Sequence, residues 1–167
     1  FDMAGDIVEF DEITCTTVLL TDDIASAPPE ELEKRRGVAG MVYAFKMAGA
    51  AAEDGRDLEA VTAIAQKAAD SCRSIGVALS SCTVPQAGKP TFEIADDEIE
   101  MGMGIHGEPG IWRGKLRTAD EIATEMMERL LADMPLAGGD RVSIMVNSLG
   151  ATPPEELYIL YNKVKAA

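Results

Sequence analysis

Apolar residues at helical spacing recur in four segments of this chain, and short apolar runs lie between them. The helical pattern covers residues 38–53, 58–71, 118–134 and 154–165, and a fifth helix is expected at residues 1–10. Strand-like runs lie at residues 14–20, 75–79, 91–94, 98–101 and 141–146, the last expected to be buried. Alternation of this kind favours an α/β fold in which helices flank a mixed sheet.

The sequence also marks the ends of these helices and a division of the chain. The expected N-caps are Asp57, Thr118 or Asp120, and Thr152, with Pro153 as the first residue of the last helix. The character of the chain changes near residues 70–75. We therefore expect two lobes, residues 1–73 as the remainder of a first α/β lobe and residues 74–167 as a second.

The charge of the chain excludes several classes of partner. The 167 residues carry a formal net charge of -14, which disfavours nucleic acid and anionic membrane surfaces, because both are bound by clustered basic residues. No apolar run approaches the ~20 residues of a membrane helix, and no signal peptide is recognisable. Cys15, Cys72 and Cys82 form no CxxC pair, so we expect reduced thiols, a cytoplasmic location and no metal site.

Two charged clusters in the first half of the chain each allow two interpretations. Asp22 and Asp23 follow the strand-like run at residues 14–20, where α/β proteins often place functional loops, but a solvated turn is the favoured interpretation. The basic residues 34–36 could meet a phosphate or an acidic partner. A solvated or ion-paired turn is again favoured.

The chain has one histidine, His106, and it lies in a glycine-rich turn. Gly104, Gly107 and Gly110 remove side-chain bulk around it, which would let another molecule approach the ring. Glu108 lies two residues away and could orient the imidazole or a substrate hydroxyl. A neutral imidazole in such a turn can act as a general base or as a nucleophile on a carbonyl compound. A structural histidine, hydrogen-bonded within the turn, is the alternative that residue chemistry leaves open.

Several common catalytic motifs are missing from the sequence. There is no GxxxxGK[ST] phosphate loop, no GxGxxG before a helix and no GxSxG nucleophile elbow. A single histidine also excludes a metal site built from several histidines. Nothing in the motifs therefore points to nucleotide binding by this chain.

Two segments resemble the K subunit of the dihydroxyacetone kinase family. They are Gly-Ile-His-Gly-Glu-Pro-Gly at residues 104–110 and Asn-Ser-Leu-Gly-Ala-Thr-Pro at residues 147–153. Residues 35–40 and 74–85 are also similar to the family. The resemblance covers nearly the whole chain, in order, and implies a two-lobed K-domain-like fold.

The resemblance implies a mechanism and a set of partners. The histidine matched by His106 attacks the carbonyl carbon of dihydroxyacetone, or of a similar small ketose, and holds it as a hemiaminal. Gly104, Gly107, Glu108 and Gly110 belong to the same substrate loop. A substrate hydroxyl is then phosphorylated from ATP with Mg, or from a phosphotransferase-system relay, held on a partner L subunit or L domain. The K subunit itself binds no nucleotide, and the family implies a homodimer.

The chain departs from the family pattern at its two ends. The family has an earlier segment with a second catalytic histidine and an aspartate base, and Asp6 does not match that aspartate without the deletion of a helix. We therefore expect a fragment that begins after the base, stops before the last strands and has no kinase activity alone. A non-catalytic ketose sensor or transcriptional coactivator of the same fold is the alternative function.

Overall fold

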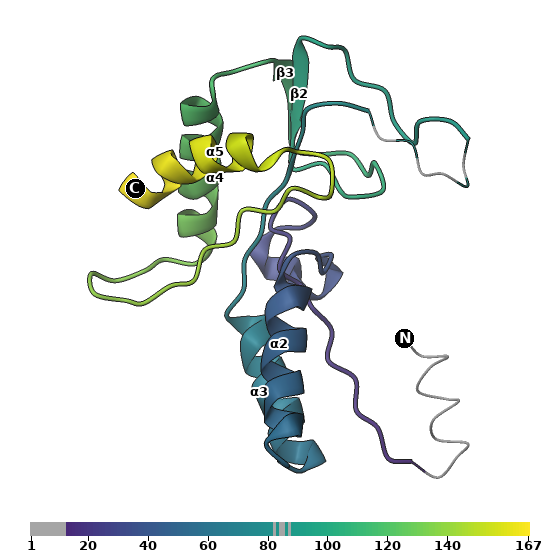
Figure 1. Ribbon diagram of the computed structural model, residues 1–167, viewed down its shortest axis with the longest axis vertical. Coiled ribbons are helices and arrows are strands. Elements are labelled where there is room, and N and C mark those ends of the chain that lie inside the picture. The colour runs from purple at the N-terminus through teal and green to yellow at the C-terminus, as the bar shows by residue number, and fades with distance from the viewer. Residues whose placement is uncertain (1–12, 82, 84–85, 87) are drawn as a thin grey trace. The chain divides into compact units, whose positions relative to one another are not determined.

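The structure is a computed structural model that describes residues 13–81, 83, 86 and 88–167. The helix expected at residues 1–10, and Cys82, lie outside the described residues. Two compact units divide the chain, and each is described by itself (Figure 1). The first comprises residues 13–23 and 31–74, and the second residues 24–30 and 75–167. The lobe boundary at residues 73/74 stays a prediction.

Two helices build the first unit. They are α2 (Gly40–Glu53) and α3 (Leu58–Asp70), which lie side by side in Figure 1 and confirm the predicted helices. Asp57 caps α3 as predicted, because its side chain accepts a hydrogen bond from the backbone N–H of Ala60. Small side chains allow the two helices to approach closely. The buried residues are Ala44, Ala51, Ala68 and Ala69.

The strand predicted at residues 14–20 of the first unit is wrong. This segment forms no strand, and the side chain of Leu19 is 69% exposed. The only bridge near it is an isolated parallel pairing of Asp23 with Ser74. β-branched residues favour an extended backbone, but a strand also needs a neighbour that takes up its N–H and C=O groups. Within the described part of the chain, no segment does so for residues 14–20.

The second unit is built around a three-stranded sheet. Its strands are β1 (Val77–Ala78), β2 (Glu98–Met101) and β3 (Trp112–Lys115), in the order β1-β2-β3. Both pairings are antiparallel, so the sheet is not mixed as predicted. β1 and β2 confirm predicted runs, whereas β3 was not predicted and residues 91–94 form no strand.

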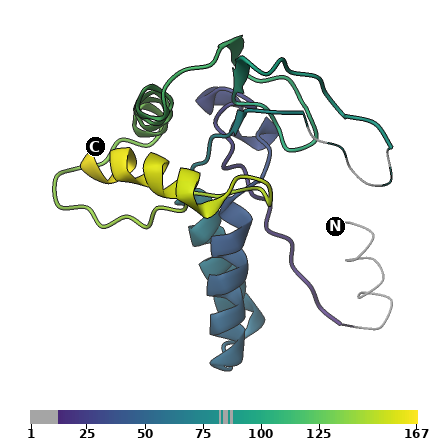
Figure 2. The ribbon, with the colours of Figure 1, turned by 45° about the horizontal axis from the view of Figure 1, so that its top comes forward.

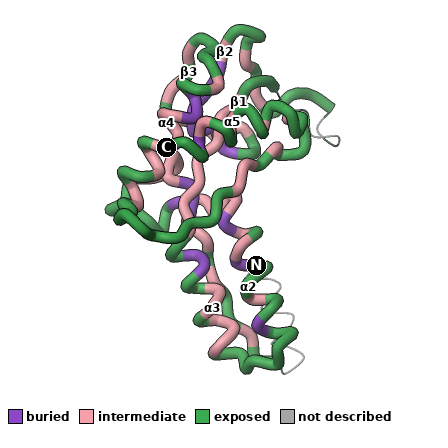
Figure 3. Tube along the Cα trace, turned by 60° about the vertical axis from the view of Figure 1, so that its left-hand side comes forward, coloured by how far each residue is buried: buried purple, intermediate pink, exposed green. Residues whose placement is uncertain are grey.

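The core of the second unit lies where the sheet meets the helices. Ile99 and Met101 of β2 are fully buried and pack with Ile122. Figure 3 draws part of β2 in the colour of buried residues. The partly buried residues against them are Ile75, Val77, Trp112, Met126 and Leu160. These residues come from β1, β3 and both helices of the unit. β2 is therefore the element that the rest of the second unit covers.

The helices of the second unit are α4 (Ala119–Asp133) and α5 (Pro154–Ala166). In Figure 1 α5 runs across α4, and Figure 2 views α4 almost along its axis. Thr118 caps α4 in a full capping box with Glu121, as the sequence predicts. The N-cap of α5 is Pro153, one residue later than the predicted Thr152. A short 3-10 segment, η1 (Pro29–Lys34), lies earlier in the chain and is interrupted at Glu31. None of the described helices is long and apolar enough to cross a membrane.

The buried strand predicted at residues 141–146 is also wrong. The segment forms no strand, and Val142 and Ile144 are exposed. The physical reason is the same as for residues 14–20, because none of the described strands pairs with this segment. Its apolar side chains consequently stay outside the core around β2.

Candidate functional site

His106 lies in the loop that joins β2 to β3. One backbone hydrogen bond closes the base of this loop, from Ile111 N–H to the carbonyl of Met101. A second, from Gly102 N–H to the carbonyl of Gly76, ties the start of the loop to the segment before β1, and both are 2.7 Å long. The antiparallel pairing of β2 with β3 continues directly from this closure. The loop is therefore a hairpin connection whose two ends are held by a buried sheet.

A tight turn at the tip of the loop presents the imidazole. The N–H of Gly107 donates to the carbonyl of Gly104, and the N–H of Gly104 donates to the carbonyl of Glu108, each at 3.0 Å. These bonds place His106 inside the turn. Its side chain is 77% exposed. A ring held in this way can meet a molecule from solution.

Glu108 binds His106 through both carboxylate oxygens. Oε2 accepts the backbone N–H of His106, and Oε1 lies 3.0 Å from Nδ1 of the ring. An ionised carboxylate only accepts hydrogen bonds, so a neutral ring bound to it carries its proton on Nδ1 and keeps the lone pair on Nε2. The prediction that Glu108 could orient the imidazole agrees with this geometry.

The hydrogen bonds to Glu108 favour its ionised form. Burial alone would raise the pKa of this carboxyl, but the backbone N–H of Glu108 and the side chain and backbone of His106 outweigh it. The pKa of Glu108 therefore lies below its ordinary value. The acceptor that fixes the ring is consequently charged at neutral pH.

Two of the loop glycines are required by close approaches within the second unit. Gly107 has a φ of +90°, and a Cβ there would lie 2.9 Å from Cδ1 of Phe92. A Cβ at Gly110 would lie 2.3 Å from the carbonyl oxygen of Met101. These contacts explain the glycines without a ligand. The expectation that Gly104, Gly107 and Gly110 give access to the ring stays a prediction.

The sequence analysis missed Glu100, whose carboxylate touches this loop. Glu100 lies on β2, and its Oε1 accepts the N–H of Gly110 at 2.6 Å. Its other oxygen binds Arg113 of β3. The signal in the sequence was the pair of acidic residues in Glu98-Ile99-Glu100-Met101. Such alternation is typical of a strand face in solvent, and the sequence does not show that the loop covers Glu100.

Asp22 and Asp23 are buried, so the favoured interpretation of a solvated turn is wrong. Asp22 is fully buried and accepts the N–H groups of Val38 and Gly40, each at 3.0 Å. It also accepts the hydroxyl of Ser74. Asp23 pairs with Arg36 at 2.8 Å, which confirms the ion-paired interpretation of the basic cluster. These acids hold the first unit together at the start of α2.

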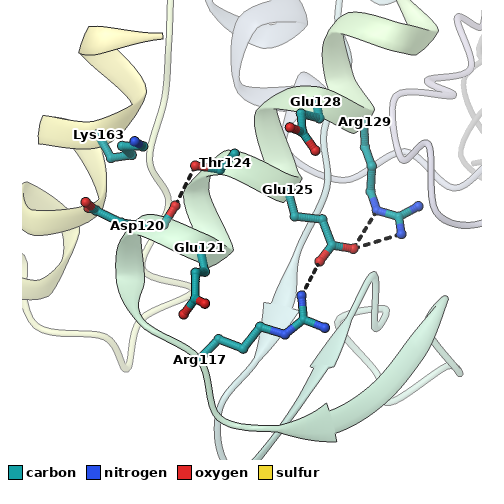
Figure 4. Close-up of a pocket in the computed structure, with 8 residues that line it drawn as sticks. All are labelled: Arg117, Asp120, Glu121, Thr124, Glu125, Glu128, Arg129 and Lys163. Atoms are coloured by element: carbon teal, nitrogen blue, oxygen red, sulfur yellow. Dashed lines mark hydrogen bonds and ion pairs between the residues drawn. The ribbon is translucent and has the colours of Figure 1, made fainter.

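A charged hollow of about 620 Å³ lies between α4 and α5 (Figure 4). Glu125 lies at its centre and binds both Arg117 and Arg129. Burial would raise the pKa of Glu125, but hydrogen bonds from Trp112 and Arg129 and the nearby arginine charges lower it more. None of the predicted site residues lines this hollow. Two of its arginines are thus paired with one glutamate.

The two described cysteines, Cys15 and Cys72, are half-buried. Burial and the charge of Asp22 raise the pKa of Cys72, against an opposing effect of Arg73. A raised pKa lowers the thiolate fraction and makes Cys72 a poor nucleophile. In the part of the chain that the structure describes, no three His, Cys, Asp or Glu side chains gather as a metal ion would need.

Comparisons with known proteins show the family to which the chain belongs. The Dak1 domain family matches residues 1–167. A Listeria innocua protein named PTS-dependent dihydroxyacetone kinase 1, dihydroxyacetone-binding subunit DhaK, is 45% identical over 164 residues, which are 98% of this chain and 50% of that subunit. The chain thus spans about half the length of this relative.

Solved structures show the same fold. The dihydroxyacetone kinase of C. freundii superimposes with a TM-score of 0.85 at 33% identity, over 100% of this chain and 30% of that one. The dihydroxyacetone kinase operon co-activator DhaQ superimposes with a TM-score of 0.86 at 31% identity, over 99% of this chain and 51% of that one. The chain has the mixed α/β fold of the kinase K domain and belongs to the Dak1 domain family.

Proposed function

We propose that this chain is the substrate-binding part of a dihydroxyacetone kinase, in which His106 holds dihydroxyacetone covalently as a hemiaminal. The observation that carries the proposal is the exposed imidazole whose Nδ1 is bound by the Glu108 carboxylate. The name of the Listeria relative, a dihydroxyacetone-binding subunit, supports the choice of substrate.

The proposed reaction begins with a neutral ring. The lone pair on Nε2 attacks the carbonyl carbon, a C–N bond forms, and the π electron pair of the carbonyl moves to its oxygen. Glu108 stabilises the positive charge that develops on the ring and takes the proton from Nδ1, while the alkoxide takes a proton from water. The hydroxide left behind recovers the proton from Glu108, so the net transfer is one proton from Nδ1 to the hemiaminal oxygen. Glycerol has no carbonyl carbon and cannot be held in this way.

The remaining step lies outside this chain. A hydroxyl of the held substrate receives a phosphoryl group from ATP with Mg, or from a phosphotransferase-system relay, on an L subunit or L domain. We propose a cytoplasmic location, because the three cysteines are far apart in the sequence and form no CxxC pair. We further propose a homodimer, and no kinase activity for the 167-residue chain alone.

A second candidate function is a non-catalytic ketose sensor that acts as a transcriptional coactivator. The similarity to DhaQ favours it, because that protein has the same fold and is named a co-activator of the dihydroxyacetone kinase operon. Both candidates require the ketose to bind at His106. Addition of an L subunit and its phosphoryl donor separates them, since only the kinase part then yields a phosphorylated ketose.

Nuclear magnetic resonance tests the covalent step directly. His106 is the only histidine, so ¹⁵N-histidine marks this single site when the chain is produced without a histidine tag. With [2-¹³C]dihydroxyacetone we expect a one-bond ¹³C–¹⁵N coupling, absent with glycerol. Hydrated ketose in solution gives a tetrahedral carbon but no such coupling. A protein that binds the ketose without this coupling contradicts the proposal.

The matched variant is His106→Asn, with unlabelled protein and the ketose signal observed by ¹³C. Asparagine suits a turn and keeps polarity, so we expect the variant to fold and to form no adduct. A covalent adduct of equal abundance in His106→Asn, detected by intact-protein mass spectrometry, would show that another side chain is the nucleophile.

A further inference from the structure

Glu100 is a buried acid for which the proposed reaction gives no use. It lies next to the last residue of β2 and is 7% exposed. A carboxylate in such a position is held by several hydrogen bonds or is destabilising. Its partners therefore indicate what it does.

The two oxygens of Glu100 bind two residues on the β3 side of the hairpin. Oε1 accepts the N–H of Gly110, four residues after His106, at 2.6 Å. Oε2 accepts both Nε and Nη2 of Arg113, each at 2.7 Å. Arg113 stands opposite Glu100 in the β2–β3 register, so the pair spans the hairpin directly below the loop. Charge-assisted bonds of this kind are short and strong.

Arg113 extends the same network to the other side of the loop. Its Nη1 donates to the carbonyl of Glu93 at 3.0 Å. The neighbouring residue, Phe92, lies against Gly107, next to His106. One buried carboxylate thus fixes the descending arm of the loop directly and, through Arg113, the segment that packs on its tip.

We propose that Glu100 is a positioning residue for His106. It holds the loop so that the imidazole stands ready for attack before the ketose arrives, which spares the cost of ordering the loop on binding. The exposed Glu108 sets the proton position on the ring, and Glu100 sets the place of the turn that carries the ring. This role rests on the proposed function of His106.

The test is Glu100→Gln in the labelled chain. Glutamine keeps the volume of glutamate and has one oxygen that can accept the N–H of Gly110. Its NH₂ group then faces the guanidinium of Arg113, and two donors cannot form a hydrogen bond with each other. We expect the dissociation constant of the ketose adduct to rise about tenfold, with the far-UV circular dichroism of wild type. The rate of adduct formation should fall more than its rate of loss rises.

Two further variants separate positioning from general weakening of the hairpin. Asp97→Asn removes the exposed ion pair of Asp97 with Lys115 at the far end of the same two strands, and we expect it to leave the adduct unchanged. Arg113→Lys keeps the charge but cannot reach Glu100 and Glu93 together. It should give a smaller loss, about threefold, and it covers the case in which Glu100→Gln does not fold.

The outcomes distinguish this inference from the proposed function. Wild-type affinity in both Glu100→Gln and Arg113→Lys, or an equal loss in Asp97→Asn, overturns the positioning role. Absence of any coupling in wild type overturns the proposed function instead. In that case the ¹⁵N chemical shifts of the His106 ring without ketose still test the role of Glu100. A misplaced turn must weaken the hydrogen bond between Nδ1 and Glu108, so the shifts should change in Glu100→Gln but not in Asp97→Asn.

Discussion

Asp22 in the first unit and Glu108 in the second are both carboxylates that accept a backbone N–H group beside a glycine-containing segment. Asp22 is fully buried, and its side chain accepts the N–H groups of Val38 and Gly40 at the start of α2 and the hydroxyl of Ser74. Glu108 is 38% exposed at its side chain and shares its oxygens between the backbone and the ring of His106. The same acceptor chemistry is structural in one unit and leaves a reactive nitrogen in the other.

The difference comes from what each carboxylate leaves uncovered. When a buried acceptor is removed, its donors lose their hydrogen-bond partner and water cannot replace it. Each donor left without a partner lowers the free energy of unfolding by about 1–3 kcal/mol. Removal of an exposed acceptor lets water replace it, so the free energy of unfolding changes little. Stability should therefore respond to Asp22, and chemistry should respond to the hairpin.

The largest effect is expected from Asp22→Ala. This substitution leaves the N–H groups of Val38 and Gly40, at the start of α2, without their acceptor. It should therefore lower the free energy of unfolding by about 2–5 kcal/mol. Urea denaturation followed by circular dichroism measures it. Asp22→Asn keeps one acceptor oxygen and should lose roughly half as much.

The matched control is Asp140→Ala, because Asp140 is an exposed aspartate that accepts the N–H of Ala137 at 2.8 Å. We expect a loss below about 1 kcal/mol there. Equal losses in the Asp22 and Asp140 variants would contradict the distinction between buried and exposed acceptors.

Gly110→Ala should have the next largest effect, and on both properties. The added Cβ would lie 2.3 Å from the carbonyl oxygen of Met101, so the loop must move away from β2. Overpacking of this kind costs about 1–3 kcal/mol. The ketose adduct should weaken at least about tenfold, as read from the ¹³C–¹⁵N coupling.

Gly49→Ala is the control for this change, since a Cβ there meets nothing within 4 Å. In an exposed helix position alanine should stabilise by about 0.5–1 kcal/mol and leave the adduct unchanged. A loss of adduct in Gly49→Ala would mean that formation of the ketose adduct responds to any change in the free energy of unfolding.

The helices of both units could be predicted from the sequence because their signals are local. The helical pattern of residues 38–53, the cap at Asp57 and the capping box at Thr118 need only neighbours within a few residues. The turn at His106 was predictable for the same reason. Its glycines and Glu108 lie within four residues of the ring.

The wrong predictions share a dependence on distant partners. Residues 14–20 and 141–146 have the composition of strands, but a strand exists only where another segment pairs with it. Asp22 was interpreted as solvated and Glu100 was not singled out, because their partners, Ser74 and Arg113, lie 52 and 13 residues further along the chain. No local pattern reveals which acidic residue a later segment will cover.

A smaller effect, confined to the adduct, is expected from Glu108→Gln. Glutamine can still accept from the ring, but without the negative charge it opposes the developing imidazolium less strongly. We expect a fivefold to tenfold weaker adduct, or about 1 kcal/mol, with unfolding changed by less than that. A loss of stability as large as that of Asp22→Ala would place Glu108 among the structural acids.

The smallest effect is the pH dependence of stability that Glu108 contributes. Its pKa is lowered in the folded chain, so its hydrogen bonds to His106 are complete above the ordinary glutamate range and are lost as the pH falls through the lowered value. The difference in free energy of unfolding between wild type and Glu108→Gln should therefore be constant near neutral pH and vanish in acid. Because the side chain is partly exposed, that difference stays below about 1 kcal/mol. If this difference in free energy of unfolding instead grows as the pH falls, the turn prefers the protonated form of Glu108. Nδ1 of the ring would then lack the charged acceptor that holds its proton, and the lone pair of Nε2 would not be kept free for attack.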